Sequence, residues 1–272
     1  AIRSLQLAKF TDTKQIMIEL LKLTEPFEVR AAVIDTLGSY TSDQAAEILI
    51  ANWRSLGPNL RSRAAETLLS RTNWIALLLD AVEAGRIVRG EIDPARIQLL
   101  KAHPDKNIVQ RVTQIFLSAP SGERLAVIKE YQSALSTTGD VSQGKEIFKK
   151  VCSACHRLEN VGTSVGADLN GIRNRGLPAV MLNILDPNRE VKPKYLTYVL
   201  IDVKGRSTTG MITAENANSI TLQKPDGTST TILRTEIEVL QSTGLSFMPE
   251  GLEKQVSKQQ MADLLSYLNA LQ

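Results

Sequence analysis

The pentapeptide Cys152-Ser153-Ala154-Cys155-His156 contains most of the cysteine and histidine side chains of this chain. The sequence has two cysteines and two histidines in all, and three of these four residues lie in the pentapeptide. Two thiols separated by a partial helical turn, followed by an imidazole, suit the covalent attachment of haem c. The thiols add to the two vinyl groups and the imidazole reaches the iron. We therefore expect one covalent haem c held by Cys152, Cys155 and His156.

Three other kinds of site use similar residues. A structural zinc site needs four ligands, yet His103 is the only other histidine or cysteine donor in the sequence. A thioredoxin-like pair follows a strand in a βαβ unit, whereas a helix is predicted before this motif. A disulfide between residues so close together would restrict little of the unfolded chain. The spacing therefore favours haem c over these alternatives.

The first half of the chain has the apolar periodicity of short amphipathic helices separated by proline, glycine and polar caps. The predicted helices span about 12–23, 26–38, 43–54, 58–71, 73–84, 94–102, 105–117 and 122–135. Residues 29–37 resemble residues 61–69, which indicates an internal repeat. The pattern resembles HEAT or armadillo-type repeats, so we expect an α-solenoid in which Trp53 and Trp74 are core residues.

The polar segment 133–142 contains the predicted domain boundary, so we predict domains at 1–135 and 136–272. Asp140 and Gln143 form a capping-box pattern for a helix that runs to about Val151, directly before the motif. A short helix is predicted over 177–185. From about 195 to 240 the apolar period changes to two, which predicts four or five antiparallel strands. We expect these strands to be an added subdomain rather than part of the haem cradle. Ser257 caps the last helix.

Residues around the motif resemble class I cytochromes c in order and spacing. Gly144 and Phe148 on the first helix, and Tyr267 and Leu268 on the last, lie where this family crosses two helices at a glycine against an aromatic residue. The segment Gly166-Ala167-Asp168-Leu169 replaces the usual Gly-Pro-x-Leu turn, whose proline carbonyl accepts a hydrogen bond from the ligand histidine. The resemblance implies that the carbonyl of the alanine takes this role, in a turn that loses some rigidity.

A closer resemblance covers about residues 138–272. The runs at 184–195 and 245–252, on either side of the predicted strands, are similar to the haem-binding domain found in planctomycetes and verrucomicrobia. In that family the module often ends large secreted proteins, behind helical repeats and a dehydrogenase-like β-propeller. The expected fold is therefore mostly α: a HEAT-like α-solenoid, then a class I cytochrome c domain with a small antiparallel β insert.

Met248 is the expected second axial ligand of the iron. It precedes Pro249 and the last helix, which is the order that class I cytochromes use to bring a thioether across the haem. The alternative is that Met248 fills a gap in the core. Arg173 and Arg175 are candidate partners of the haem propionates, although loop arginines are more often only solvated. The other candidate axial ligands are Met17, Met181, Met211, Met261 and His103.

The predicted function is one-electron transfer, because iron with histidine and methionine ligands has no open position for a substrate. We expect no enzymatic activity in this chain, a redox protein or an upstream dehydrogenase domain as partner, and haem attachment in the periplasm or an equivalent space. The chain starts at Ala1, and we expect a processed or excised piece of something longer. One alternative is a haem enzyme or sensor with a labile distal ligand. Another is a repeat domain that docks partners, with a subordinate haem.

Two classes of protein are disfavoured by composition. Lys plus Arg is 32 and Asp plus Glu is 29, with no basic run, so a dedicated nucleic-acid binder is not expected. The longest apolar runs are far shorter than the roughly 18 residues that cross a bilayer, so no membrane span is expected in this chain.

Overall fold

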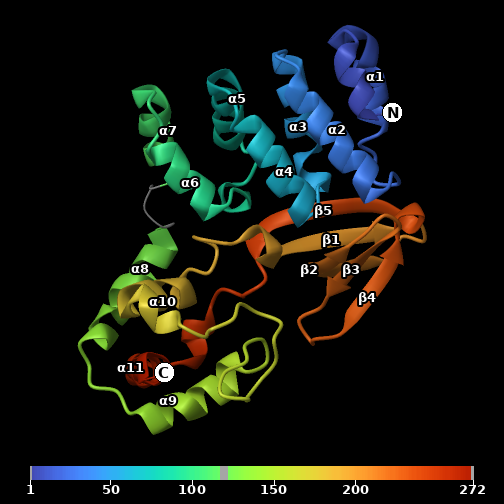
Figure 1. Cartoon of the computed structure of the whole chain (residues 1–272). Helices are drawn as coiled ribbons and strands as arrows, with labels where there is room; N and C mark the ends of the chain where they lie inside the picture. The colour runs from blue at the N-terminus through green and yellow to red at the C-terminus, as the bar shows by residue number, and fades with distance from the viewer. Residues whose placement is uncertain (1, 117–121, 271–272) are drawn as a thin grey trace. The chain divides into compact units, whose positions relative to one another are not determined.

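The computed structural model describes residues 2–116 and 122–270, and its first half is a succession of short helices (Figure 1). All eight predicted helices are present, although residue 117, the last of the predicted 105–117 helix, lies outside the described residues. A 3-10 helix at Ile2–Leu7 precedes them and was not predicted. The α-helices are α1 Phe10–Glu19, α2 Phe27–Ser39, α3 Asp43–Asn52, α4 Pro58–Leu68, α5 Thr72–Glu83, α6 Pro94–Lys101, α7 Lys106–Phe116 and α8 Gly122–Tyr131.

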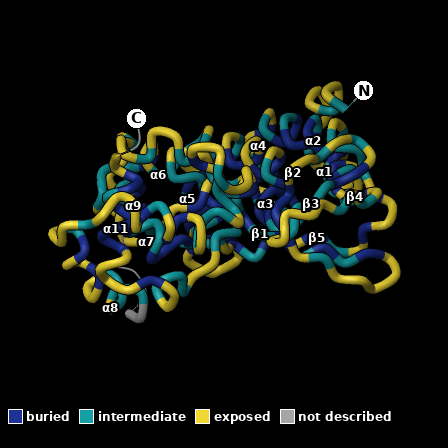
Figure 2. Tube along the Cα trace, turned by 90° about the horizontal axis from the view of Figure 1, so that it is seen from below, coloured by how far each residue is buried: buried dark blue, intermediate teal, exposed yellow. Residues whose placement is uncertain are grey.

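Local signals in the sequence set the starts of these helices. Pro58 and Pro94 occupy first-turn positions of α4 and α6, where a missing N–H does no harm. The buried apolar side chains of α1 to α7 form one core, in which Trp53 and Trp74 are fully buried. Figure 2 colours the buried residues dark blue along the chain. The prediction that both tryptophans are core residues is confirmed. None of the described helices is both long and apolar enough to span a membrane.

Five strands form one antiparallel sheet, which confirms the change of period near residue 195. The strands are β1 Leu196–Asp202, β2 Ser207–Glu215, β3 Ser219–Gln223, β4 Ser229–Leu233 and β5 Ile237–Ser246. The sheet order is β4-β3-β2-β1-β5, so the last strand crosses back to pair beside the first. Tyr198 lies opposite Gly210 in the β1–β2 pair, and the β2–β3 register shifts between Ile212 and Ala214. The sheet extends beyond residue 240, the end that we predicted, to Ser246.

Three further α-helices lie in the second half: α9 Val141–Ile147, α10 Leu177–Leu185 and α11 Lys258–Ala270. Ser257 and Gln260 bond to each other's backbone N–H, so α11 starts with a capping box. At α9, Asp140 accepts from the N–H groups of Ser142 and Gln143. The N–H of Asp140 itself donates to Asp263 of α11 rather than to Gln143, so the predicted capping box is only half formed.

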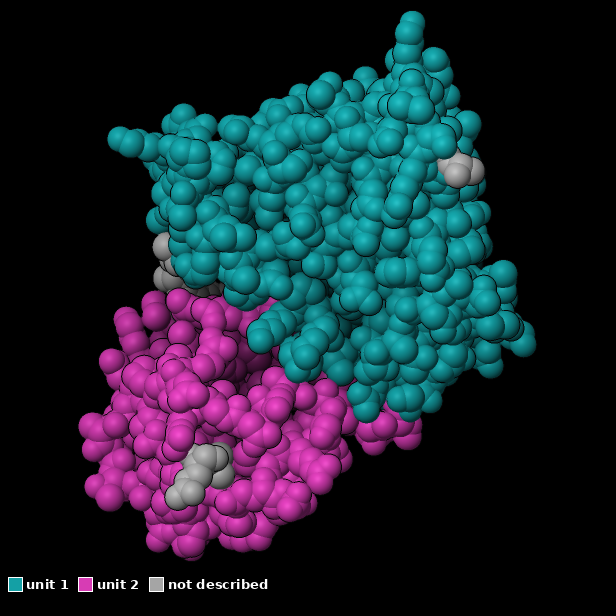
Figure 3. All heavy atoms as spheres, viewed as in Figure 1, with its two compact units in different colours: residues 1–118, 192–224, 229–245 teal, residues 119–191, 225–228, 246–272 magenta. Residues whose placement is uncertain are grey.

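The described chain divides into two compact units that do not follow the order of the sequence (Figure 3). Unit 1 contains residues 1–118, 192–224 and 229–245, and unit 2 contains residues 119–191, 225–228 and 246–272. This division differs from the predicted boundary at 135/136 in two ways. The strands belong with the helical repeats, and α8 belongs with the C-terminal helices. The cause is a set of side-chain contacts between residues far apart in sequence.

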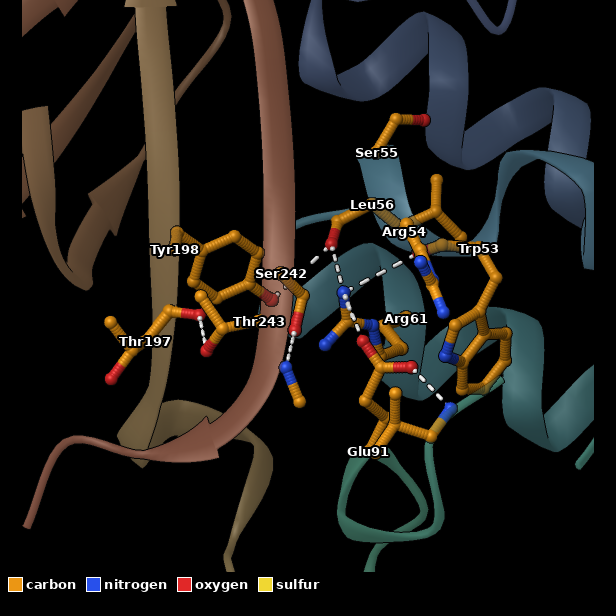
Figure 4. Close-up of polar contacts among 12 residues, drawn as sticks. Trp53, Arg54, Ser55, Leu56, Arg61, Glu91, Thr197, Tyr198, Ser242 and Thr243 are labelled. Carbon is orange, nitrogen blue, oxygen red and sulfur yellow. Dashed lines mark hydrogen bonds and ion pairs between the residues drawn. The ribbon is translucent and has the colours of Figure 1, made fainter. Parts of the chain in front are cut away.

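In unit 1, Arg61 of α4 joins the repeats to the sheet (Figure 4). Its Nη2 donates to the Leu56 carbonyl at 3.1 Å, and the Tyr198 hydroxyl of β1 donates to the same carbonyl at 3.3 Å. The Arg61 guanidinium lies 5.3 Å from the centre of the Tyr198 ring and 3.7 Å from the Glu91 carboxylate. The Arg61 and Glu91 side chains are 1% and 0% exposed. Burial raises the pKa of Tyr198 to about 12.

A second buried charge cluster in unit 1 involves the end of β2. Arg234 donates to Glu215 at 2.8 Å, and both side chains are 1% exposed. A Cβ added at Gly57, before α4, would collide with the Glu215 carboxylate, so the glycine leaves room for this charge. Burial lowers the pKa of Arg30 to about 10, with Glu215 opposing the shift. Buried charges of this kind are stable only when paired and hydrogen-bonded, so they fix the sheet in one position on the repeats.

Candidate functional site

The two cysteines lie in a tight turn after helix α9 of unit 2. Helix α9 continues into a π-helical turn, Phe148–Cys152. The N–H groups of Cys155 and His156 then donate to the Cys152 carbonyl at 3.1 and 2.9 Å. Both thiols are free and partly exposed. The turn therefore presents two reduced thiols and one imidazole within five residues.

The imidazole of His156 is oriented by a backbone carbonyl. Its Nδ1 lies 2.8 Å from the carbonyl oxygen of Ala167. A carbonyl only accepts hydrogen bonds, so in the neutral imidazole the proton is on Nδ1, and Nε2 has the lone pair that a metal ligand needs. This contact is the one implied by the Gly166-Ala167-Asp168-Leu169 segment, and that expectation is confirmed. Alanine thus supplies the carbonyl in place of proline.

Gly166 provides the surface on which this imidazole lies. A Cβ at Gly166 would be 2.6 Å from Cε1 and 2.9 Å from both nitrogens of the ring, closer than any side chain tolerates. The N–H of Gly166 donates to the Cys155 carbonyl at 2.6 Å. Sequence reasoning placed Gly166 in the turn but did not identify it as a site residue. The signal that marks it is its position directly before Ala167, whose carbonyl accepts the hydrogen bond from His156.

The segment after the motif folds back over it. Leu158 and Val161 form an isolated bridge, and the hydroxyl of Thr163 donates to the Ala154 carbonyl at 2.6 Å. Gly162 has a φ of 92°, and a Cβ there would collide with the His156 carbonyl. This close approach requires glycine. The motif is therefore held by its own local backbone.

Both thiols are protonated at neutral pH. Burial, and then the neighbouring Cys155, raise the pKa of Cys152 to about 11, and burial also raises the pKa of Cys155. A resting thiolate of the kind that redox pairs and nucleophilic cysteines need is therefore disfavoured. In the described ranges 2–116 and 122–270, no three or more His, Cys, Asp or Glu side chains are arranged so that they could hold a metal ion among themselves. A four-ligand zinc site has no candidate there.

Helices α9 and α11 cross at a glycine, as the resemblance to class I cytochromes c implied. A Cβ at Gly144 would collide with the Asp263 carbonyl and lie 2.7 Å from the Cβ of Tyr267. The rings of Phe148 and Tyr267 are 5.9 Å apart and tilted by 56°. This geometry confirms the expected crossing, which brings the helix that precedes the motif against the last helix.

A polar network links this crossing to the loop after the motif. The carboxylate of Glu159, two residues after Arg157, accepts from Lys145 at 2.6 Å and from the Tyr267 hydroxyl at 3.0 Å. These hydrogen bonds lower the pKa of Glu159. Burial and the hydrogen bond to Glu159 raise the pKa of Tyr267 to about 12. Lys145 is therefore paired with Glu159 within unit 2.

Met248 differs from the other methionines of the chain. All five methionines lie in the described residues, and four of them are 4% exposed or less within helices or strands: Met17, Met181, Met211 and Met261. Met248 alone is half-buried and lies in a segment without regular structure, in the same unit as the motif. Core packing thus accounts for the four others and leaves Met248 as the candidate ligand.

The two candidate propionate partners have different surroundings. Both lie in the 3-10 turn Ile172–Arg175 and are exposed. Arg175 is paired with Glu190 at 3.0 Å, whereas the described part of the chain shows no ion pair for Arg173. His103 lies in unit 1, where its Nδ1 accepts from the N–H of Asp105 in the turn between α6 and α7. This bond supports a structural role for His103.

Comparison with known proteins identifies part of the chain. The HEAT repeat family model matches residues 1–69, which contain α1 to α4. The N-terminal region is therefore HEAT-like, in agreement with the helical repeat seen in the sequence. No cytochrome c family model matched the chain. No curated protein matches it.

Proposed function

We propose that unit 2 carries one covalent haem c and that the chain transfers single electrons. The hydrogen bond between His156 Nδ1 and the Ala167 carbonyl carries this proposal, because it orients the ring of the residue that follows two free cysteines in the sequence and leaves Nε2 available as a ligand. When bound, the haem would supply a one-electron couple at its iron. Cys152 and Cys155 would hold it covalently, and His156 and Met248 would bind its iron.

The donor set favours a carrier over an enzyme. A histidine and a thioether would both bind the iron, which would leave it no open position for a substrate. A neutral thioether also favours the reduced iron, so the expected reduction potential is comparatively high. In this proposal the partner is a redox protein or a dehydrogenase domain, and the haem is attached in the periplasm or an equivalent compartment. Arg173 is the better propionate candidate, because Arg175 already has Glu190 as its partner.

The test compares Met248→Ala with Met181→Leu in haem-loaded protein. Met248→Ala should keep the covalent haem, abolish the weak sulfur-to-iron charge-transfer band of the oxidised protein, lower the potential and let the reduced iron bind carbon monoxide. Met181→Leu keeps the volume of a buried core residue, so it should leave all of these unchanged. If Met248→Ala keeps the sulfur band, Met248 is not the ligand.

A second candidate function is a sensor or enzyme with a labile distal ligand. The observation that favours it is the half-buried position of Met248 on an irregular segment, from which a thioether can detach more readily than from a helix. Carbon monoxide binding to the reduced wild-type protein at neutral pH separates the two functions. A carrier should exclude the gas, whereas a sensor or enzyme should bind it readily.

A further inference from the structure

The segment that contains Met248 joins the end of the sheet to the last helix. Strand β5 ends at Ser246, and a 3-10 helix starts at Leu252. Residues 247–251 between them have no helix or strand, and Pro249 and Glu250 are exposed. A segment with few regular hydrogen bonds needs other contacts to keep one conformation.

The side chain of Asn188 supplies contacts at both ends of this segment. Its Oδ1 accepts from the N–H of Ser246 at 2.7 Å, and its Nδ2 donates to Glu250 Oε1 at 2.6 Å. The Ser246 hydroxyl in turn accepts from the N–H of Met248 at 3.1 Å. One amide side chain is therefore hydrogen-bonded to the chain two residues before and two residues after Met248.

Asn188 is itself fixed to the core of unit 2. Helix α10 ends at Leu185, which is fully buried, and the N–H of Asp186 still donates to the Leu182 carbonyl at 2.8 Å. Pro187 then restricts the backbone directly before Asn188. The amide thus projects from a short, constrained turn behind a buried helix. It connects the Met248 segment to a rigid element.

The chain beyond Met248 is held by a different element. Arg124 of α8 pairs with Glu253 at 2.6 Å, and these side chains are 11% and 9% exposed. The Tyr131 hydroxyl lies 2.9 Å from the Glu253 carbonyl and 2.7 Å from the Val256 carbonyl. These contacts anchor the approach to α11 but do not reach Met248. The two hydrogen bonds of Asn188 are the ones that bracket it.

We propose that Asn188 is a positioning residue that holds Met248 in place as the distal ligand of the haem iron. This inference rests on the proposed haem function. A thioether is a weak ligand, so its residence on the iron depends on how little freedom its segment has when detached. An amide is suited to this role because it presents an acceptor and a donor on one short side chain.

The experiment uses the haem-loaded full chain with Asn188→Leu, which has a similar shape and removes both hydrogen bonds. We expect the equilibrium constant for Met248 ligation to fall about tenfold, because two hydrogen bonds of modest net strength are lost. The sulfur-to-iron band should weaken, the potential should fall and carbon monoxide should bind more readily. Asn170→Leu, at an exposed asparagine of the same unit, is the control and should change none of these.

A swapped pair, in which position 188 becomes the acid and position 250 the amide, tests the hydrogen bond between these two side chains. Asn188→Asp keeps the acceptor for Ser246 but sets two carboxylates against each other, so it should weaken the sulfur band. Adding Glu250→Gln restores a donor opposite the new carboxylate and should recover the band. A merely structural role for Asn188 would not link the potential to the pairing partner at position 250. If circular dichroism shows that Asn188→Leu does not fold, the swapped pair alone tests the role of Asn188.

The outcomes separate this inference from the proposed function. Matured wild-type protein without covalent haem, or with haem but no sulfur band, would overturn His156/Met248 ligation and the positioning role with it. If the wild type shows the band, and Asn188→Leu or Asn188→Asp keeps the same band, potential and exclusion of carbon monoxide, the role of Asn188 is wrong. The haem function would stand in that case.

Discussion

The motif region of unit 2 and the repeat–sheet region of unit 1 are held by contacts of very different range. His156 finds its partner 11 residues away, at a backbone carbonyl. Tyr198 bonds to the Leu56 carbonyl across 142 residues, beside a buried arginine. The first region is built by backbone and glycine, and the second by buried charged side chains. Substitutions should therefore act by steric collision in unit 2 and by unpaired charge in unit 1.

The largest effect is expected at Arg61. Arg61→Met leaves Glu91 buried without its cation and removes a donor to the Leu56 carbonyl, so we expect about 3–5 kcal/mol of destabilisation. Arg63→Met, two residues along the same helix, breaks an exposed ion pair with Asp35 and should cost about 0–1 kcal/mol. Urea unfolding of both variants measures the difference. Equal costs would mean that the buried cluster does not hold the sheet on the repeats.

Gly144→Ala tests the helix crossing of unit 2. The added methyl group collides with the Asp263 carbonyl, and backbone cannot yield without separating α9 from α11. We expect a loss of about 3 kcal/mol, the upper end for an overpacked core. Gly251→Ala, in the same unit, meets only side-chain atoms of Lys254 at 3.8 Å, and its left-handed backbone, with a φ of 87°, accounts for a cost of about 1 kcal/mol. If both variants unfold at the same denaturant concentration, the crossing is looser than described.

Gly166→Ala tests the local support of the imidazole. The methyl group would press on the His156 ring from 2.6 Å, so we expect about 1–2 kcal/mol of destabilisation and a reduced yield of covalent haem. Gly171→Ala, where the nearest other atom is 3.4 Å away, should lower stability without a matching loss of haem. Haem per protein and thermal unfolding are the measurements. Unchanged haem loading in Gly166→Ala would contradict the role of this glycine.

The smallest expected effect is the contribution of Glu159 to the pH dependence of stability. Hydrogen bonds from Lys145 and Tyr267 lower its pKa in the folded protein, so the folded state binds this proton less readily than the unfolded state. The resulting stability is present above the unfolded glutamate pKa, roughly 4.3, and is lost as pH falls through the lower folded value. When the unfolding midpoint is measured as a function of pH, Glu159→Gln should therefore lose less stability than the wild type as the pH falls through this range. Glu146→Gln, at an exposed i,i+3 pair with Lys149, is the control and should leave the curve unchanged.

Local features were predictable from the sequence because their causes are local. Prolines, caps and apolar periodicity predicted the eight N-terminal helices, and the segment Gly166-Ala167-Asp168-Leu169 predicted the hydrogen bond to His156. The crossing of α9 and α11 followed from a glycine and an aromatic residue at familiar spacing. Each of these signals lies within the segment that it organises.

The grouping of the strands with the repeats was not predictable in the same way. It depends on Arg61, Arg234 and Glu215, which look like ordinary surface charges in the sequence and become buried only when distant segments meet. The same holds for Asn188, whose two partners lie 58 and 62 residues further along the chain. Such pairings have no periodicity and no motif, so only the folded chain shows them.

The most direct test of the haem assignment is a pyridine haemochrome assay, with oxidised and reduced absorption spectra, on the full chain matured in the periplasm with a cytochrome c maturation system. We expect one covalent haem c per chain, a low-spin spectrum and a sulfur-to-iron band, with the covalent haem lost in Cys152→Ser/Cys155→Ser. Folded, matured wild-type protein without covalent haem would contradict the assignment.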